Sequence, residues 1–366
     1  MSKRIKNAYH PDMVSPPGET LAELLGFRGM TQAELSQRMG RPTKTINEII
    51  QGKTALTPET AVQLETVLGV PARIWNKREL AYRESLVEQA VAEGLQAEIA
   101  VLDEFPIAAL ERRRWMPTYE EPVRRLRELL RFFGVAGVVQ LRQWRDKALA
   151  AANFRQSTSF HSDPGTVAAW MRKGEEEASR IKCAPYDEQA FQAALHSIRA
   201  LTQETPEVFQ PEIVKRCAAV GVAVAFVQEF PAMAISGVTC WLTPHKALIQ
   251  VSLRYKNDDQ LWFSFFHEAA HILKHGKRDV FVEGEGINKS NKEKEADDWA
   301  AEFLIPSVKY RQFVQTTASR SKQGIQTFAD QIGIAPGIIV GRLQHDKYLP
   351  FTHCNELKQK IVWSDD

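Results

Sequence analysis

Three residues whose types and spacing could do chemistry lie together in FSFFHEAAHILKHG, residues 263–276. On an α-helix, residues four apart differ by about 40° in rotation and by one turn in height. His267 and His271 would therefore project from one face and could share one metal ion. Glu268 is rotated by about 100° from His267, which suits a general base for a metal-bound water. Zn²⁺ accepts imidazole and carboxylate ligands and has no redox chemistry, so the stretch predicts a zinc site suited to hydrolysis.

A catalytic zinc site needs a third protein ligand, and NKEKEADDWAAEFLIP, residues 291–306, offers carboxylates on an expected helix. Glu295, Asp298 and Glu302 fall at i, i+3 and i+7, on one face of that helix. We predict Glu295 as the third ligand and Asp298 as a carboxylate that orients a ligand histidine. Glu302 is the alternative ligand.

Two other interpretations of these residues remain open at this point. His275 lies eight residues after His267, about 12 Å along a helix axis, so it could join the same ion only if the helix unwinds. The two ligand histidines could also be hydrogen-bonded residues of a buried helix, because Phe263, Phe265 and Phe266 surround them with apolar surface. A buried imidazole still needs a polar partner, which a metal ion would provide.

A second set of candidates lies near the N-terminus, in MTQAELSQRMGRPTKTINEIIQGKTALTPETAVQLETVLG, residues 30–69. Short helical segments that begin at Thr31, Pro42 and Thr57 and stop at glycine predict a helix-turn-helix unit. The second helix carries small and polar residues at its start, as a helix that enters the major groove does. The residues predicted to contact DNA bases or phosphates are Gln32, Arg41, Thr43, Lys44, Asn47 and Lys53.

These candidates must be positioned by elements that the periodicity indicates. Segments 222–230, 235–242 and 247–253 are rich in β-branched residues and predict strands, and helices are expected over 261–275 and 291–304. The predicted fold is mainly α with an α+β part. It comprises an all-helical helix-turn-helix domain (1–76), a helical connector (77–200), an α+β zincin-like domain with a small sheet (201–310) and a C-terminal helical segment (311–366). That last segment contains IQTFADQIGIAPGIIVGRLQ, a helix-turn-helix pattern whose second helix is apolar and suited to packing on protein.

Composition places few limits on function. The chain has 366 residues, of which 44% are hydrophobic and 25% charged, so several domains with sizeable cores can form. A net charge of +2 neither requires nor excludes nucleic acid, so a basic surface must be local. Scattered cysteines, no apolar run of membrane-spanning length and no apolar signal core predict a cytoplasmic protein with no membrane partner.

The segments FSFFHEAAHILKHG and KEKEADDWAAEFLIP together resemble the ImmA/IrrE metallopeptidases, over about residues 247–306. The resemblance implies a zinc site with His267, His271 and Glu295 as ligands and Glu268 as catalytic base. It also implies limited proteolysis of a regulatory protein, often one that binds DNA. Ala269 and Ala270 stand where many relatives have larger residues, which changes no ligand.

The segments SPPGETLAELL, MTQAELSQRMG and LTPETAVQLETVLGVPARIW resemble the XRE-type domain of HigA-like antitoxins. Pro42 and Lys44 replace the Ser and Gln common in that family. The resemblance implies a homodimer that binds an inverted repeat in double-stranded operator DNA, with a cognate toxin as a protein partner. The sequence thus predicts a transcriptional regulator or antitoxin that carries a zinc endopeptidase. The alternative is a non-catalytic antitoxin or repressor in which the metallopeptidase fold is a structural or sensing scaffold.

Overall fold

The computed structural model describes residues 14–151, 163–254, 256–277, 280–284 and 291–361. Its contacts divide the chain into two compact units, Met1–Ile99 and Ala100–Asp366. No helix within these described ranges is long and apolar enough to cross a membrane.

The first unit is entirely helical. Its elements are α1 (Pro17–Arg28), α2 (Gln32–Met39), α3 (Thr43–Ile50), α4 (Pro58–Leu68) and α5 (Ala72–Ala97). Helix α2 begins with a capping box in which Thr31 and Glu34 satisfy each other's backbone N–H groups, and it ends at left-handed Gly40. Gly18 allows α1 to approach α3 closely, because a Cβ there would lie 2.1 Å from the carbonyl oxygen of Ile49. The apolar side chains of these helices form one core around fully buried Trp75.

The second unit is built on a four-stranded mixed sheet with the order β1-β3-β2-β4. The strands are β1 (Val222–Phe226), β2 (Ile235–Thr243), β3 (Lys246–Val251) and β4 (Phe281–Gly284). Strand β1 runs parallel to β3, whereas β2 is antiparallel to both β3 and β4. The predicted strands are present, and β4 is an additional strand that the sequence did not indicate.

The other main elements of the second unit are helices. They are α6 (Ile107–Arg112), α7 (Pro122–Phe133), α8 (Val138–Ala151), α9 (Pro164–Arg180), α10 (Glu188–Arg199), α11 (Pro206–Ala218), α12 (Asp258–Lys274), α13 (Asn291–Leu304), α14 (Ser307–Val314), α15 (Lys322–Ile332) and α16 (Pro336–His345). Short 3-10 helices span Ile99–Glu104, Ala200–Gln203, Thr317–Arg320 and Asn355–Leu357. The chain is thus mainly helical with an α+β part, as predicted.

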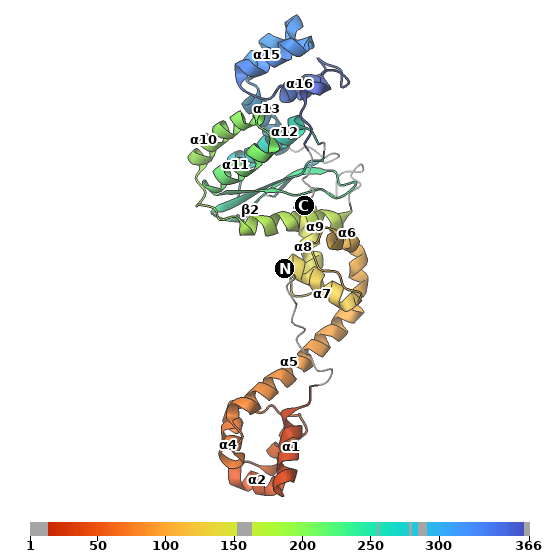
Figure 1. The fold of residues 1–366 in the computed structure, drawn as a ribbon, viewed down its shortest axis with the longest axis vertical. Coiled ribbons are helices and arrows are strands. Elements are labelled where there is room, and N and C mark those ends of the chain that lie inside the picture. The colour runs from red at the N-terminus through yellow and green to blue at the C-terminus, as the bar shows by residue number, and fades with distance from the viewer. Residues whose placement is uncertain (1–13, 152–162, 255, 278–279, 285–290, 362–366) are drawn as a thin grey trace. The chain divides into compact units, whose positions relative to one another are not determined.

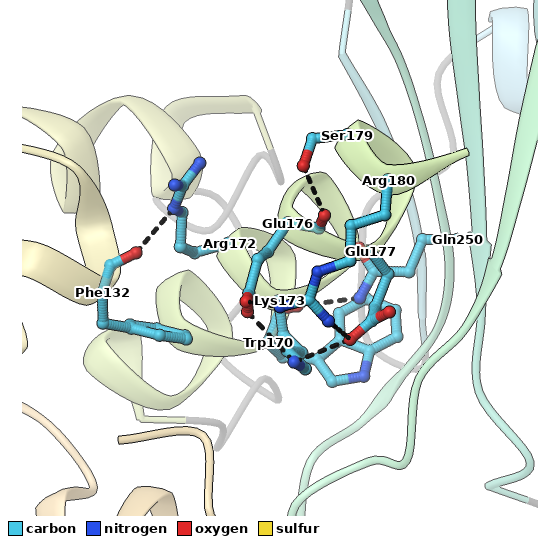
Figure 2. A network of polar contacts seen from close by, with 9 residues as sticks. All are labelled: Phe132, Trp170, Arg172, Lys173, Glu176, Glu177, Ser179, Arg180 and Gln250. Atoms are coloured by element: carbon cyan, nitrogen blue, oxygen red, sulfur yellow. Dashed lines mark hydrogen bonds and ion pairs between the residues drawn. The ribbon is translucent and has the colours of Figure 1, made fainter. Parts of the chain in front are cut away.

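The two faces of the sheet are covered by different helices (Figure 1). Helices α11 and α12 pack on one face, where Ile249 and Val251 of β3 join a core that contains Trp262 and Phe266. Helix α9 packs on β1 and β3, and here the side chain of Gln250 points toward the helix (Figure 2). The buried Gln250 amide donates to the Trp170 carbonyl oxygen at 2.8 Å.

Helix α9 is also tied to its other neighbours by polar contacts. Trp170 Nε1 donates to the carbonyl oxygen of Val227 at 3.1 Å, and Arg172 Nε donates to that of Phe132 at 2.8 Å. Figure 2 shows the contact between Arg172 and Phe132 beside a row of ion pairs along the helix, in which Lys173 contacts Glu176 and Glu177 at 3.0 and 2.7 Å. Helix α9, expected within the connector, is therefore a layer of the second unit.

The C-terminal helix pair packs on protein, which confirms the expectation for the second helix-turn-helix pattern. Helix α16 lies against α12, and its apolar residues Ile339 and Leu343 are fully buried. Gly337 and Gly341 bring its backbone against the start of α12, where a Cβ at either position would lie within about 2.5 Å of an aspartate oxygen, of Asp258 or Asp259 respectively.

Candidate metal centre and nucleic-acid interface

Helix α12 forms where the sequence predicted it and is buried on nearly every side. The capping residue Asn257 precedes it, and the chain leaves the helix at His275, where the backbone becomes extended. His267 and His271 lie on one face, with 1% and 2% of their surfaces exposed. Their Nε2 atoms are 3.0 Å apart, so the two imidazoles are directed at the same point.

The third group at this point is the carboxylate of Glu293, from the first turn of α13. Its Oε2 lies 3.0 Å from His267 Nε2, and its Oε1 lies 3.5 Å from His271 Nε2. His267, His271 and Glu293 each offer a ligand atom within 4.8 Å of the others. The residues that the structure brings together are therefore two predicted ligands and one that was not predicted.

The prediction of Glu295 as the third ligand needs correction. Its carboxylate is 56% exposed and lies 3.4 Å from Nε2 of His275, on the far side of His271. The physical reason is the helix face: α13 turns Glu293, Ala296, Ala300 and Leu304 inward. A carboxylate that shares a metal ion with the histidines of α12 must lie on that inward face. The face predicted from the sequence, with Glu295, Asp298 and Glu302, is the other one.

The other acidic residues of α13 also differ from the prediction. Asp297, rather than Asp298, approaches a ligand histidine, with its Oδ1 3.0 Å from His267 Nδ1. Asp298 is exposed and lines the adjoining cavity. Glu302 accepts the backbone N–H of Ser307 at 3.0 Å, so it caps the start of the next helix.

The geometry of the three ligand atoms fits a zinc ion. Ligand atoms about 2.1 Å from a tetrahedral ion lie about 3.4 Å from one another. His267 Nε2 lies 3.0 Å from both His271 Nε2 and Glu293 Oε2, and the other carboxylate oxygen, Oε1, lies 3.5 Å from His271 Nε2. A donor set of two imidazoles and one carboxylate is one that catalytic zinc sites use. The three residues therefore fit the ion, with no rearrangement of the two helices.

Glu268 lies beside this cluster in a fully buried position. Both of its carboxylate oxygens lack a hydrogen-bond partner among the described residues. Burial of such a group costs free energy of folding, and a polar partner bound in the site would remove that cost. Gly237 on β2 makes room for the carboxylate, since a Cβ there would lie 2.3 Å from Glu268 Oε1. The Thr239 hydroxyl donates to the carbonyl oxygen of Glu268 at 3.0 Å, which fixes the helix against the strand.

The electrostatics of the cluster follow from burial and mutual contact. Burial raises the pKa of Glu268 well above its ordinary value, and the neighbouring carboxylate of Glu283 adds to this shift. Burial alone would also raise the pKa of Glu293, but its hydrogen bonds to His267 and His271 outweigh that effect and lower the pKa to about 2. Burial lowers the pKa of His271. The metal-free site thus favours an ionised Glu293 and a neutral His271, the forms that bind metal. For His267, burial lowers the pKa but the carboxylates of Glu283, Asp297 and Glu293 outweigh it and raise the pKa, so a metal ion would have to displace a proton there.

A cavity of about 430 Å³ opens next to the cluster. His267 and Glu293 form part of its wall, together with residues of β4. The opposite wall includes Ile338, Gly341 and Arg342 of α16. Strand β4 contributes in a second way, because the Phe281 ring stacks on His271 with centroids 4.0 Å apart. The cluster is therefore open to a substrate on the His267 side and covered on the His271 side.

The predicted DNA-contacting residues lie in the first unit, around α2 and α3. Lys44 and Lys53 are exposed, and Lys44 lies 3.8 Å from Glu48 on the same helix. Asn47 is half-buried and accepts from Gln51 at 3.2 Å, and Gln32 is half-buried at the first residue of α2. All four stay available at the start of α2, along α3 or just after it.

Two other predicted DNA contacts are engaged inside the unit. Arg41 contacts Glu59 at 3.2 Å and donates to Gln63, both on α4, and only 22% of its side chain is exposed. We therefore reassign Arg41 to holding α4 in place. The Thr43 hydroxyl donates to Ser36 at 3.0 Å, which ties the start of α3 to α2.

Comparison with known proteins gives matches to both units. The profile described as helix-turn-helix matches residues 21–75, and that of the IrrE N-terminal-like domain matches residues 217–343. The HTH-type transcriptional regulator YddM of Escherichia coli K12 is 30% identical over 87 residues, which are 24% of this chain and 88% of that protein.

Two solved structures also match in part. An addiction module antidote protein of a HigA family from Coxiella burnetii is 28% identical, with 23% of this chain and 94% of that one covered and a TM-score of 0.22. A putative antidote protein of a plasmid maintenance system from Nostoc punctiforme is 25% identical over 23% of this chain and 91% of its own, with a TM-score of 0.22. The sequence matches bear out both resemblances: the chain belongs to the helix-turn-helix transcriptional regulators and carries, in its second unit, an IrrE N-terminal-like peptidase-family domain.

Proposed function

We propose that this regulator is a zinc-dependent endopeptidase that cleaves a regulatory protein partner, while its first unit binds operator DNA as a homodimer. A DNA-binding unit supports activity in the cytoplasm, where an operator would be found. The resemblance to HigA-like antitoxins supports a role beside a toxin gene, with the toxin or a second repressor as the protein partner.

One observation carries the peptidase proposal. The two imidazoles and the Glu293 carboxylate meet at one point, with contacts of 3.0 to 3.5 Å between their ligand atoms, beside the fully buried side chain of Glu268, whose carboxylate oxygens have no hydrogen-bond partner among the described residues. A site kept only for structure needs the ligands but not Glu268, because a buried carboxylate without a partner destabilises the fold. Its presence next to the ligand cluster therefore supports hydrolysis.

Metal binding, orientation of a ligand and proton transfer would fall to different residues. His267, His271 and Glu293 would hold the ion, and Asp297 would fix the orientation of His267 through Nδ1. A bound zinc ion supplies a Lewis acid and lowers the pKa of its water. Glu268 accepts a proton from the attacking water and delivers it to the leaving amine. The cavity beside His267 would receive the peptide.

The DNA-binding part rests on α3 and its surroundings. Lys44 and Asn47 lie in its first two turns, where a recognition helix meets base edges. Exposed Lys53 follows the helix and would contact a phosphate. Thr43 and Arg41 would act indirectly, by holding α3 against α2 and α4.

The test of the peptidase proposal compares wild-type protein with Glu268→Gln. Bound zinc is measured by elemental analysis, and cleavage is followed on the neighbouring toxin, on this chain itself and on casein as a general substrate. We expect both proteins to bind one zinc ion and only the wild type to cleave. The glutamine substitution keeps the volume of the side chain and removes only the base.

Two outcomes would contradict the proposal. Wild-type protein that binds no zinc would remove the metal site. Wild-type protein that binds zinc and cleaves none of these substrates would favour the alternative, a non-catalytic antitoxin or repressor whose peptidase fold serves as a scaffold or sensor.

A further inference from the structure

A third histidine, His275, lies directly behind the ligand cluster. Only 4% of its side chain is exposed. Helix α12 ends at Lys274, but the backbone N–H of His275 still donates to the carbonyl oxygen of His271 at 3.1 Å. The chain then extends, and this turn brings the His275 ring onto the outer edge of the His271 ring. Its Nδ1 lies 2.9 Å from Nδ1 of His271, away from the cluster of ligand atoms.

Metal binding at His271 would decide which of the two Nδ1 atoms carries the proton. A neutral imidazole has one N–H and one lone pair, so two ring nitrogens can share a hydrogen bond only if one donates and the other accepts. His271 must keep a lone pair on Nε2 to bind a metal ion, and its proton is then on Nδ1. His275 therefore accepts at Nδ1 and carries its own proton on Nε2.

The proton on Nε2 of His275 faces a carboxylate. Glu295 Oε2 lies 3.4 Å from this nitrogen, which has no hydrogen-bond partner in the described part of the chain. The contact with the Glu295 carboxylate is thus the interaction that the structure provides for this N–H. Glu295 is half exposed, so its carboxylate can adjust to the N–H.

Aromatic packing holds the two rings in this arrangement. Phe281 of β4 stacks on His271 and also lies 5.0 Å from the His275 ring, centroid to centroid. A ring flip of either histidine would have to displace Phe281. The chain of contacts from Glu295 through His275 to His271 is therefore restrained by the Phe281 ring as well as by the Glu295 carboxylate.

The other histidine of the cluster, His267, is also contacted by a carboxylate, but with no residue in between. His267 Nδ1 lies 3.0 Å from the Asp297 carboxylate, so a carboxylate of α13 contacts this imidazole directly. His271 lies too far from α13 on that side for direct contact, and His275 bridges the gap to Glu295. Helix α13 then supplies one ligand and both carboxylates that orient the two ligand histidines.

We propose that His275 is a positioning residue that connects Glu295 to His271 and holds His271 in the tautomer with its proton on Nδ1, leaving Nε2 free for a metal ion. This inference rests on the proposed metal site, because the tautomer of His271 matters for function only if His271 binds a metal ion. The contacts that would hold this tautomer, from Nδ1 of His271 to His275 and from His275 to Glu295, are present in the metal-free chain.

The first test measures zinc affinity of the full chain by competition with a chromophoric chelator. His275→Leu removes the acceptor, and we expect zinc to bind about 10- to 100-fold more weakly. His275→Asn places an amide oxygen where Nδ1 was and should keep the affinity within about threefold of wild type, well short of the usual cost of losing such a partner. Lys274→Ala, an exposed neighbour at the end of the same helix, is the matched control and should change nothing.

Equal losses in the leucine and asparagine variants would overturn the proposal, because they would mean that the ring itself, as ligand or as filler, is what matters. Unchanged affinity in His275→Leu would overturn it as well. Glu295→Ala, at a half-exposed position that leaves the fold intact, should weaken zinc binding by up to about tenfold. No loss in that variant would remove Glu295 from the chain of contacts.

The second test reads the tautomer of His271 by ¹H–¹⁵N correlation spectroscopy of the zinc-loaded protein, with the spectrum of the metal-free protein used for assignment. Wild type and His275→Asn should carry the proton on Nδ1, and His275→Leu should lose this preference. A proton on Nε2 in wild type would overturn the inference even though zinc binds. If wild type binds zinc and shows the Nδ1 proton but cleaves no substrate, the proposed peptidase function fails and the positioning role of His275 stands.

Discussion

Gly237 offers the most direct test of how the buried base is held. It lies on β2, facing α12, and a Cβ at this position would lie 2.3 Å from Oε1 of Glu268 and 2.8 Å from its Cδ and Cγ. Ordinary contacts between carbon and oxygen are longer by about 1 Å. Glu268 is fully buried, so its carboxylate cannot swing into solvent and must shift within the site. We predict that Gly237→Ala displaces the base by about 1 Å while the three ligand residues stay in place.

The size of the effect follows from that displacement. A misplacement of about 1 Å in a reacting group can cost about a hundredfold in rate, which corresponds to about 2.7 kcal/mol in the activation free energy. The assay measures kcat/KM for cleavage of the protein partner, and zinc affinity is measured on the same samples. We expect kcat/KM to fall about a hundredfold and zinc affinity to change by less than about threefold, since no ligand or its orienting partner is lost.

A double-mutant cycle makes the test specific to Glu268. Glu268→Asp shortens the side chain by one methylene group and relieves the clash with a Cβ at position 237. The loss caused by Gly237→Ala should therefore be much smaller in the Glu268→Asp background than in wild type. Additive losses, or a Gly237→Ala protein with unchanged kcat/KM, would refute the role assigned to this glycine. Loss of zinc to the same extent as loss of activity would refute it too.

Three further predictions concern other parts of the chain. Asp297→Asn should weaken zinc binding about tenfold, whereas Asp298→Asn, at the exposed neighbouring position, should not; chelator competition compares them. Lys44→Ala combined with Asn47→Ala should abolish binding to a DNA site selected by the wild type while leaving the helical circular dichroism unchanged; retained specificity in a gel-shift assay would remove α3 as the reading helix. Burial and the neighbouring aspartate raise the pKa of Asp258 from 3.8 to about 7, so the folded state resists ionisation and wild type should lose stability as the pH rises from about 4 to about 7. Asp258→Asn should lack this loss, and urea unfolding at pH 5 and pH 8 measures it; parallel pH profiles would contradict the assignment.

The elements that position the site could be predicted from periodicity and from helix boundaries. The sequence indicated α13 over residues 291–304, and the structure gives Asn291–Leu304. It placed His267, Glu268 and His271 on one helix, as the structure does, and put the two histidines on one face because a spacing of four residues fixes a common face in any α-helix. Strand β4 was missed, since it has only four residues and no alternating pattern long enough to recognise.

The third ligand could have been predicted by a stricter use of the same rule. Ala296 and Ala300 are apolar residues of the same predicted helix, and Glu293 lies three and seven residues before them, on the same face. The choice of Glu295 assumed that a carboxylate ligand belongs to the acidic face of the helix. A metal bound by a buried helix requires the opposite, a lone acid on the apolar face.

The contacts of Gly237 and His275 could not be predicted from sequence patterns. The strand that contains Gly237 is separated from Glu268 by about thirty residues, and nothing local indicates that a glycine there leaves room for a carboxylate. The role of His275 depends on where the helix unwinds, which follows from the packing of Phe281 and β4. Both are tertiary contacts, which local propensity does not encode.

The packing of α9 and α16 on this unit decides where the chain can be cut for experiments. A fragment limited to residues 201–310 would lose α9, and with it the partner of the buried Gln250 amide on one side of the sheet. It would also lose α16 and Lys358, whose Nζ lies 2.7 Å from the Asp259 carboxylate. Both truncations would leave a buried polar group without its partner, the Gln250 amide in one case and the Asp259 carboxylate in the other. We therefore expect such a fragment to fold poorly and to be insoluble. Expression trials have better prospects with boundaries near residue 100 and beyond residue 361.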